Sequence, residues 1–255
     1  ITLAGNGSID TTFTHFNVNA HALTRNFNLG KLLGPEMGVG RLSMYLDLKA
    51  AQTGAENLVA DIEGAIDQIQ YDSLDLKNIL FNGYYNPKDM GAALKANLPM
   101  GNLIASASMT QENVPDILFD VDIDSLHVDQ FYKNDGWKNP RLSLCLNGNI
   151  KGLDVDRMTG QVYVDSLDFR GDNFLFQPGR ISLEMSRNSD MDKQIALKSS
   201  ILSANVSGYY TFMTLADELS DVMYNYMSNV FPRTKSIRNK QNNFNVELTV
   251  YNTQK

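Results

Sequence analysis

Apolar and polar residues alternate with a period of two along most of the chain, which is typical of strands with one apolar and one polar face. In 41–48, for example, every second residue is apolar. The apolar positions of the alternating segments are Leu42, Met44, Leu46 and Leu48; Ile117, Phe119, Val121 and Ile123; Leu142, Leu144 and Leu146; Val162 and Val164; Ile181, Leu183 and Met185; and Phe244, Val246, Leu248 and Val250. The pattern predicts an all-β chain.

Turn-forming residues separate these segments. They are Asn82-Gly83, Asn86-Pro87, 99–101, Asp135-Gly136, Asn147-Gly148, 170–172 and 177–179. Because short turns join antiparallel neighbours, the sheet is predicted to be mainly antiparallel.

One segment follows a helical spacing instead. Thr214 is a suitable N-cap, and Pro232 ends the pattern. The apolar stripe is Leu215, Leu219, Val222, Met223, Tyr226, Met227 and Val230. We expect an amphipathic helix over 214–230 that covers an end or the inner face of the sheet, with a mobile lid as the alternative. A shorter helical turn is expected over 28–33, ended by Gly34-Pro35, and an exposed loop is expected over 233–243.

Composition and charge exclude several classes of function. The 255 residues carry 22 Lys and Arg against 29 Asp and Glu, a net charge of −7, and no basic run suits a nucleic-acid backbone. One cysteine excludes an internal disulfide framework. No run of ~18 apolar residues is present to cross a bilayer as a helix.

Candidate chemical groups favour structural roles. Asp120, Asp122, Asp124, His127 and Asp129 are dense, but the sixth and twelfth positions of a calcium loop counted from Asp120 hold Ser and Phe, so we interpret the run as a strand with a solvated acidic face.

The remaining candidates have a structural and a functional interpretation. Cys145 is a small strand side chain or a nucleophile, and Trp137 is a loop anchor or a sugar-stacking platform. His15 falls in an alternating run and is expected to point outward. We expect no catalytic residue, no metal ion and no cofactor.

Five segments, in order along the chain, resemble recurring units of the AsmA/TamB superfamily of envelope proteins. Segment 26–34 contains Leu-Gly-Lys-Leu-Leu, which resembles the family's segment after a strand, and 59–66 resembles a glycine-interrupted strand. Segment 71–85 resembles the tyrosine and Lys-Asn-Ile hairpin of TamB-like proteins. Segments 152–160 and 199–208 resemble the family's Leu-Asp unit and the strand that precedes a helix.

This resemblance implies an elongated, curled sheet or open β-groove, and a non-enzymatic role in phospholipid transport between membranes or in outer-membrane protein assembly. The implied partners are phospholipid, or another acyl-chain lipid, and the outer-membrane β-barrel assembly machinery, with no nucleic acid. The implied location is the periplasm, with a parent protein anchored in the inner membrane. The family's N-terminal anchor and the C-terminal domain of TamB are not recognisable, so we expect an interior segment: one β-repeat segment over 1–255, or two stacked subunits of about 1–135 and 136–255.

An apolar strand face must be buried against something. With one strong helix for about a dozen strands, the sheet either folds on itself as a sandwich or leaves apolar surface open to a ligand. The expected lipid groove is lined by Leu42, Met44, Leu46, Phe119, Val121, Ile123, Leu142, Leu144, Leu146, Val162, Val164, Ile181 and Leu183. Its expected helical cover is Leu215, Leu219, Val222, Met223, Tyr226 and Met227. Two alternatives stay open: a β-sandwich module on the cell surface that binds a glycan or a protein, and a β-rich hydrolase.

Overall fold

A computed structural model describes residues 1–12, 14–34, 37–54, 56–72, 74–132, 134, 136–189, 192–212, 224 and 242–251. Within these residues, fifteen strands form one sheet. The strand pairs whose register is known are all antiparallel. The predicted all-β, mainly antiparallel fold is therefore confirmed.

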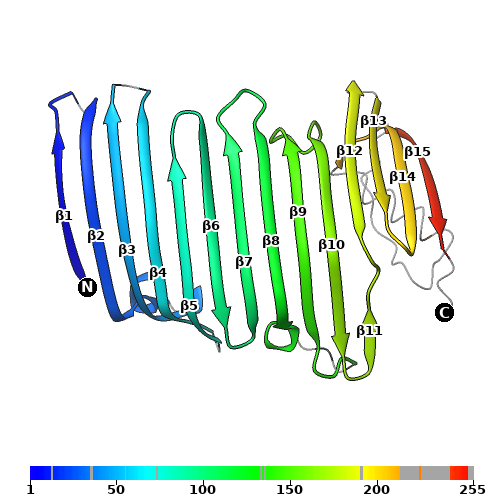
Figure 1. Ribbon diagram of the computed structural model, residues 1–255, viewed down its shortest axis with the longest axis horizontal. Coiled ribbons are helices and arrows are strands. Elements are labelled where there is room, and N and C mark those ends of the chain that lie inside the picture. Colours follow the sequence, from blue (N-terminus) through cyan, green and yellow to red (C-terminus); the bar gives the residue numbers. More distant parts are fainter. Residues whose placement is uncertain are drawn as a thin grey trace. The chain divides into compact units, whose positions relative to one another are not determined.

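Hydrogen-bonded neighbours follow the order of the chain from β1 to β10 and from β12 to β15, and β12 is next to β10, which also pairs with β11 (Figure 1). The strands are β1 Thr2–Ile9, β2 His15–Asn28, β3 Val39–Thr53, β4 Leu58–Tyr71, β5 Leu74–Tyr85, β6 Asp89–Leu98, β7 Gly101–Thr110, β8 Asp116–His127, β9 Arg141–Lys151, β10 Thr159–Gly171, β11 Phe174–Phe176, β12 Ile181–Ser189, β13 Asp192–Lys198, β14 Leu202–Tyr209 and β15 Asn243–Val250. The helical elements are α1 Gly30–Leu33 and the 3₁₀ turn η2 Val128–Gln130.

The chain divides into two compact units. Unit 1 consists of 1–147 and 164–177, and unit 2 of 148–163 and 178–255. In unit 1, the strands β1–β8 lie side by side in chain order (Figure 1).

Several local predictions can be compared with the structure. The helical turn before Gly34 is confirmed as α1, and Gly34 follows it with φ 100°, a left-handed value that suits glycine. The predicted turns at Asn82-Gly83 and Asn147-Gly148 are wrong, because both dipeptides lie inside strands, β5 and β9. At Gly83 a Cβ would lie 3.1 Å from Cγ2 of Ile62 and 3.2 Å from the carbonyl oxygen of Gly91, so the tight space there, and not a turn, favours glycine.

The predicted helix over 214–230 lies outside the described residues, except for Tyr224, and so do all six residues expected to cover the groove. The predicted loop over 233–243 likewise falls outside them, except for its last two residues.

Unit 2 has a small core at one end of its strands. Val206 and Tyr210 are buried there, and Ile195, Phe212 and Phe244 pack against them. Tyr210 is only 1% exposed, and this burial raises the pKa of its hydroxyl to about 12. The buried Lys193 ammonium donates a hydrogen bond of 2.7 Å to the backbone oxygen of Tyr210. The buried ammonium group of Lys193 is therefore hydrogen-bonded to the backbone of this core.

Candidate functional site

The register of unit 1 places apolar residues of neighbouring strands directly opposite each other. Four consecutive cross-strand rows run from β2 to β8, and we call them the apolar face of unit 1. The rows are Val18, Ala50, Ala60, Tyr85, Met90, Met109 and Ile117; Ala20, Leu48, Ile62, Gly83, Ala92, Ala107 and Phe119; Ala22, Leu46, Gly64, Phe81, Leu94, Ala105 and Val121; and Thr24, Met44, Ile66, Ile79, Ala96, Leu103 and Ile123. None of these residues is charged, and Thr24 and Tyr85 hold the only hydroxyl groups.

The opposite side of the same strands carries charged residues, together with exposed apolar ones such as Leu80 and Ile104. Its central rows are His21, Asp47, Glu63, Asn82, Ala93, Ser106 and Asp120; and Asn19, Lys49, Asp61, Tyr84, Gly91, Ser108 and Leu118. We call this the polar face of unit 1. The alternation in the sequence therefore gives one side of β2–β8 four uncharged rows and the other side rows that contain charged residues.

No described element of unit 1 packs over the apolar face. The main contacts of β1–β8 join each strand to its neighbour in the order, and α1 contacts β3. Of the 28 residues in the four rows, Gly64 and Ala96 are buried, while the others are half-buried or exposed, Ile62 to 37%. A face of this size and composition, left accessible to solvent, is typical of a binding surface.

The apolar face contains a hollow of about 450 Å³ over β4–β8. Its rim includes large side chains such as Ile62, Phe81 and Phe119, while Leu94 and Val121 also line it. Its floor is made of small residues: Gly83, Ala92 and Ala107, which pair in one row across the strands, and Ala105. From β4 to β8 the sheet extends about 19 Å at the usual strand spacing. One acyl chain spans half of the ~30 Å hydrocarbon core of a bilayer and is therefore about 15 Å long, which is shorter than this width.

The structure brings the predicted lining residues of β3 and β8 to this one face. Phe119 and Val121 line the hollow, Ile123 lies in the next row, and Met44 and Leu46 lie in the rows on β3. Leu42 is on the same side of β3, opposite Ile69 and buried. The hollow residues of β5, β6 and β7 were not predicted, although Ile79, Phe81, Gly83 and Tyr85 also alternate in the sequence.

The other predicted lining residues lie on later strands. Leu142, Leu144 and Leu146 alternate along β9, and Val162 and Val164 along β10, all of them half-buried. Ile181 and Leu183 are on β12 of unit 2. Unit 2 has its own apolar rows: Leu183, Leu197, Ala204 and Leu248; and Met185, Ile195, Val206 and Val246.

The acidic run forms the predicted strand from Asp120 to His127, whereas Asp129 lies in the 3₁₀ turn η2. Asp120, Asp122 and Asp124 are exposed on the polar side of β8, and the described residues contain no group of three or more His, Cys, Asp or Glu side chains arranged to hold a metal ion. The Cys145 thiol is half-buried, and burial together with the charges of Asp122, Asp120 and Asp165 raises its pKa. A raised pKa disfavours the thiolate that nucleophilic attack requires.

Trp137 lies within an aromatic cluster. Its ring centroid is 5.0 Å from that of Phe169 and 5.9 Å from that of Tyr132, and Phe174 packs on the same group. The side-chain amide of Asn173 donates to the backbone oxygen of Gly136, which ties this loop to the β10–β11 hairpin. These contacts favour the anchor over the sugar platform for Trp137. His15, the first residue of β2, is exposed, and its Nδ1 lies 3.1 Å from the Asp10 carboxylate.

Comparison of the chain with protein families, with curated proteins and with solved structures finds no match. Within the residues that the structure describes, no helix combines the length and the apolar character needed to cross a membrane.

Proposed function

We propose that the apolar face of unit 1 binds the acyl chains of phospholipid or of another acyl-chain lipid. On this proposal the chain is a non-enzymatic cell-envelope protein of AsmA/TamB type, which acts in phospholipid transport between membranes or in outer-membrane protein assembly. The observation that carries the proposal is the set of four uncharged cross-strand rows, over which no described element packs.

The chemistry of the face suits this ligand. Each methylene that leaves water for an apolar surface contributes about 0.8 kcal/mol, so a long acyl chain gains enough from burial to bind without any polar anchor. The hollow offers such a chain a lining of large apolar side chains and small residues. A transfer protein needs no reacting group, and the proposal assigns none.

The family resemblance of the sequence adds the cellular setting to the proposal. On this proposal the protein acts in the periplasm, its parent protein is anchored in the inner membrane, and the outer-membrane β-barrel assembly machinery is a further partner. Acyl-chain binding is the part that the geometry of unit 1 supports directly, and it is tested first.

Native mass spectrometry of the full chain, purified from a lipid-containing host, tests the proposal. We expect phospholipid masses on the protein. Ala105→Trp should fill the hollow and lower the bound fraction, while Ile104→Trp places the same ring on the opposite face, where Ile104 is exposed opposite Lys95, and should leave the bound fraction unchanged. A lipid-free chain that also fails to bind fluorescent phospholipid would contradict the proposal.

A further inference from the structure

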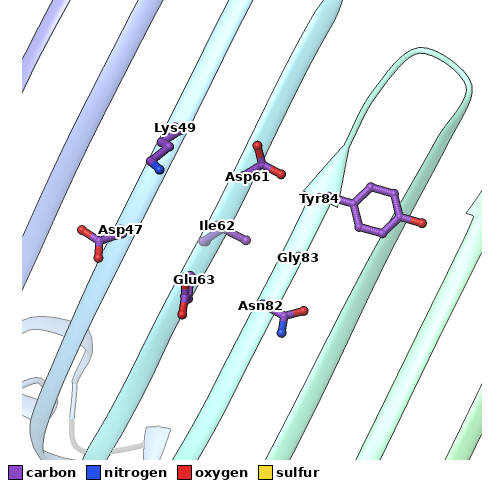
Figure 2. Close-up of a pocket in the computed structure, with 8 residues that line it drawn as sticks. All are labelled: Asp47, Lys49, Asp61, Ile62, Glu63, Asn82, Gly83 and Tyr84. Atoms are coloured by element: carbon purple, nitrogen blue, oxygen red, sulfur yellow. The ribbon is translucent and has the colours of Figure 1, made fainter.

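On the polar face of unit 1, the ring of Tyr84 lies flat over Gly91. The two residues pair across β5 and β6, and a Cβ at Gly91 would lie 2.6 Å from Cε1 and 3.0 Å from Cζ of the ring. Figure 2 shows the ring face-on in a view down onto the strands. Tyr84 is 43% exposed. One face of the ring therefore covers the glycine, and the other is presented to solvent.

A hollow of about 340 Å³ lies beside this ring. It is lined by Asp47, Lys49, Asp61, Glu63, Asn82 and Tyr84, together with Ile62 and Gly83 (Figure 2). Asp61 is the cross-strand partner of Tyr84, and Asn82 precedes it by two residues on the same face. The hollow thus combines hydrogen-bond acceptors on the carboxylates, donors on the lysine, and both on the amide.

We propose that Tyr84 and this hollow bind a pyranose sugar. A pyranose whose hydroxyls are equatorial has a flat face of C–H groups, and such a face suits the negative π surface of an aromatic ring. Its rim of hydroxyls, each a donor and an acceptor, matches the acceptor oxygens of Asp61 and the amide of Asn82, the two polar groups nearest to Tyr84. The exposed ring extends from β5 over β6, and Asp61 on β4 and Asn82 on β5 lie at the side of the hollow next to Tyr84 (Figure 2).

The charges in the hollow define the class of sugar. Three carboxylates stand against one ammonium group, so an acidic sugar would meet net repulsion. The site is therefore selective for neutral sugars and amino sugars over uronic acids. It lies on the opposite face from the acyl-chain hollow, so sugar binding does not depend on the proposed lipid function.

Saturation-transfer NMR on the full chain tests the site, with methyl β-glucopyranoside, glucosamine and glucuronic acid as probes. We expect transfer to the axial protons of the first two sugars and little to glucuronic acid. Tyr84→Ala should weaken binding about fivefold, the factor expected from losing an aromatic contact. Tyr84→Phe should retain binding, as should Tyr71→Ala, which removes an exposed tyrosine of the same unit.

Gly91→Ala gives a second test that keeps the phenol ring in the protein. The added methyl group must push the ring off the sheet, so binding should fall although Tyr84 is still present. The amide spectrum of each variant reports whether the fold is kept. Equal transfer in wild type, Tyr84→Ala and Gly91→Ala would overturn the proposal, and so would the absence of transfer to any sugar. Choline is a further probe in the same experiment. Saturation transfer to choline but to no sugar would mean that the Tyr84 ring binds cations, and would also overturn the proposal.

Discussion

The ring of Phe81 lies over Gly64 on the apolar face of unit 1. The two residues pair across β4 and β5, and a Cβ at Gly64 would lie 2.5 Å from Cζ of the ring and 2.7 Å from the carbonyl oxygen of Tyr45. Tyr84 covers Gly91 in the same way on the opposite face. Glycine weakens a strand interior, and an aromatic ring packed on it restores part of the lost contact. Strand β5 thus carries one such ring on each face.

Gly64→Ala should destabilise unit 1 by about 1–3 kcal/mol, the usual range for overpacking. The Tyr45 oxygen belongs to the backbone and cannot move aside as a side-chain tip would. Urea unfolding of the variant measures the change. In a Phe81→Ala background the same substitution should be less destabilising, because the ring is gone. Strict additivity of the two changes would show that the ring does not pack on Gly64.

Lys193 should stabilise unit 2 through its buried ammonium group. The side chain is 7% exposed. Its Nζ donates to the Tyr210 backbone oxygen and lies 3.9 Å from Oδ1 of Asp156. That same oxygen accepts a 2.7 Å hydrogen bond from the backbone N–H of Phe212, so one group of contacts holds the end of the 192–212 segment.

Lys193→Met keeps the apolar stem but leaves the Tyr210 carbonyl without its ammonium donor. We expect a loss of about 1–3 kcal/mol in the free energy of unfolding, measured by denaturant titration. Lys198→Met, at an exposed position on the same strand, serves as the control and should change stability little. Equal stability of the two variants would show that the buried ammonium contributes nothing.

Asp10 should make the β1–β2 turn sensitive to acid. Desolvation opposes ionisation of its carboxyl, but the hydrogen bonds from Thr12, His15 and Thr14 together outweigh it and hold the pKa well below the ordinary 3.8. The carboxylate accepts from the Thr12 hydroxyl at 2.8 Å and from the Thr14 backbone N–H at 2.9 Å. Because the folded pKa is lowered, this stabilisation is complete above pH 3.8 and is lost as the pH falls toward the folded value.

An NMR titration of the Thr14 amide follows this group. Its chemical shift should stay constant at pH values where exposed carboxylates already protonate, and should move only under more acidic conditions. Asp10→Asn should abolish the transition. A midpoint near 3.8 for the Thr14 amide would show that the turn does not hold the carboxylate.

Sequence alternation predicted the strands because one face of each is apolar. In β8, for example, Phe119 lies on the apolar face and the next residue, Asp120, on the polar face. Gly34, which follows α1, illustrates that a glycine can predict where a helix ends. Asn82-Gly83 misled the turn prediction because this dipeptide is typical of hairpin turns. In β5, Asn82 instead faces the polar side, and Gly83 forms part of the floor of the apolar hollow.

Neither hollow could be predicted from sequence alone. Each depends on the register, which decides that Gly83 stands opposite Ala92, and Tyr84 opposite Gly91. Alternation gives the face of each residue but not its partner on the next strand. A floor of small residues appears only when several strands are aligned.

Site-specific photo-crosslinking tests the central claim most directly. Val121 lines the apolar hollow, while Asp122, the next residue of β8, is exposed on the polar face. Benzoyl-phenylalanine is placed at each position in turn, and the full chain is illuminated with phosphatidylethanolamine and phosphatidylglycerol vesicles whose lipids carry a fluorophore on the acyl chain. The account predicts labelled protein with the probe at 121, strongly reduced by Ala105→Trp, and little label with the probe at 122. Equal labelling at both positions, or labelling at 122 alone, would contradict it.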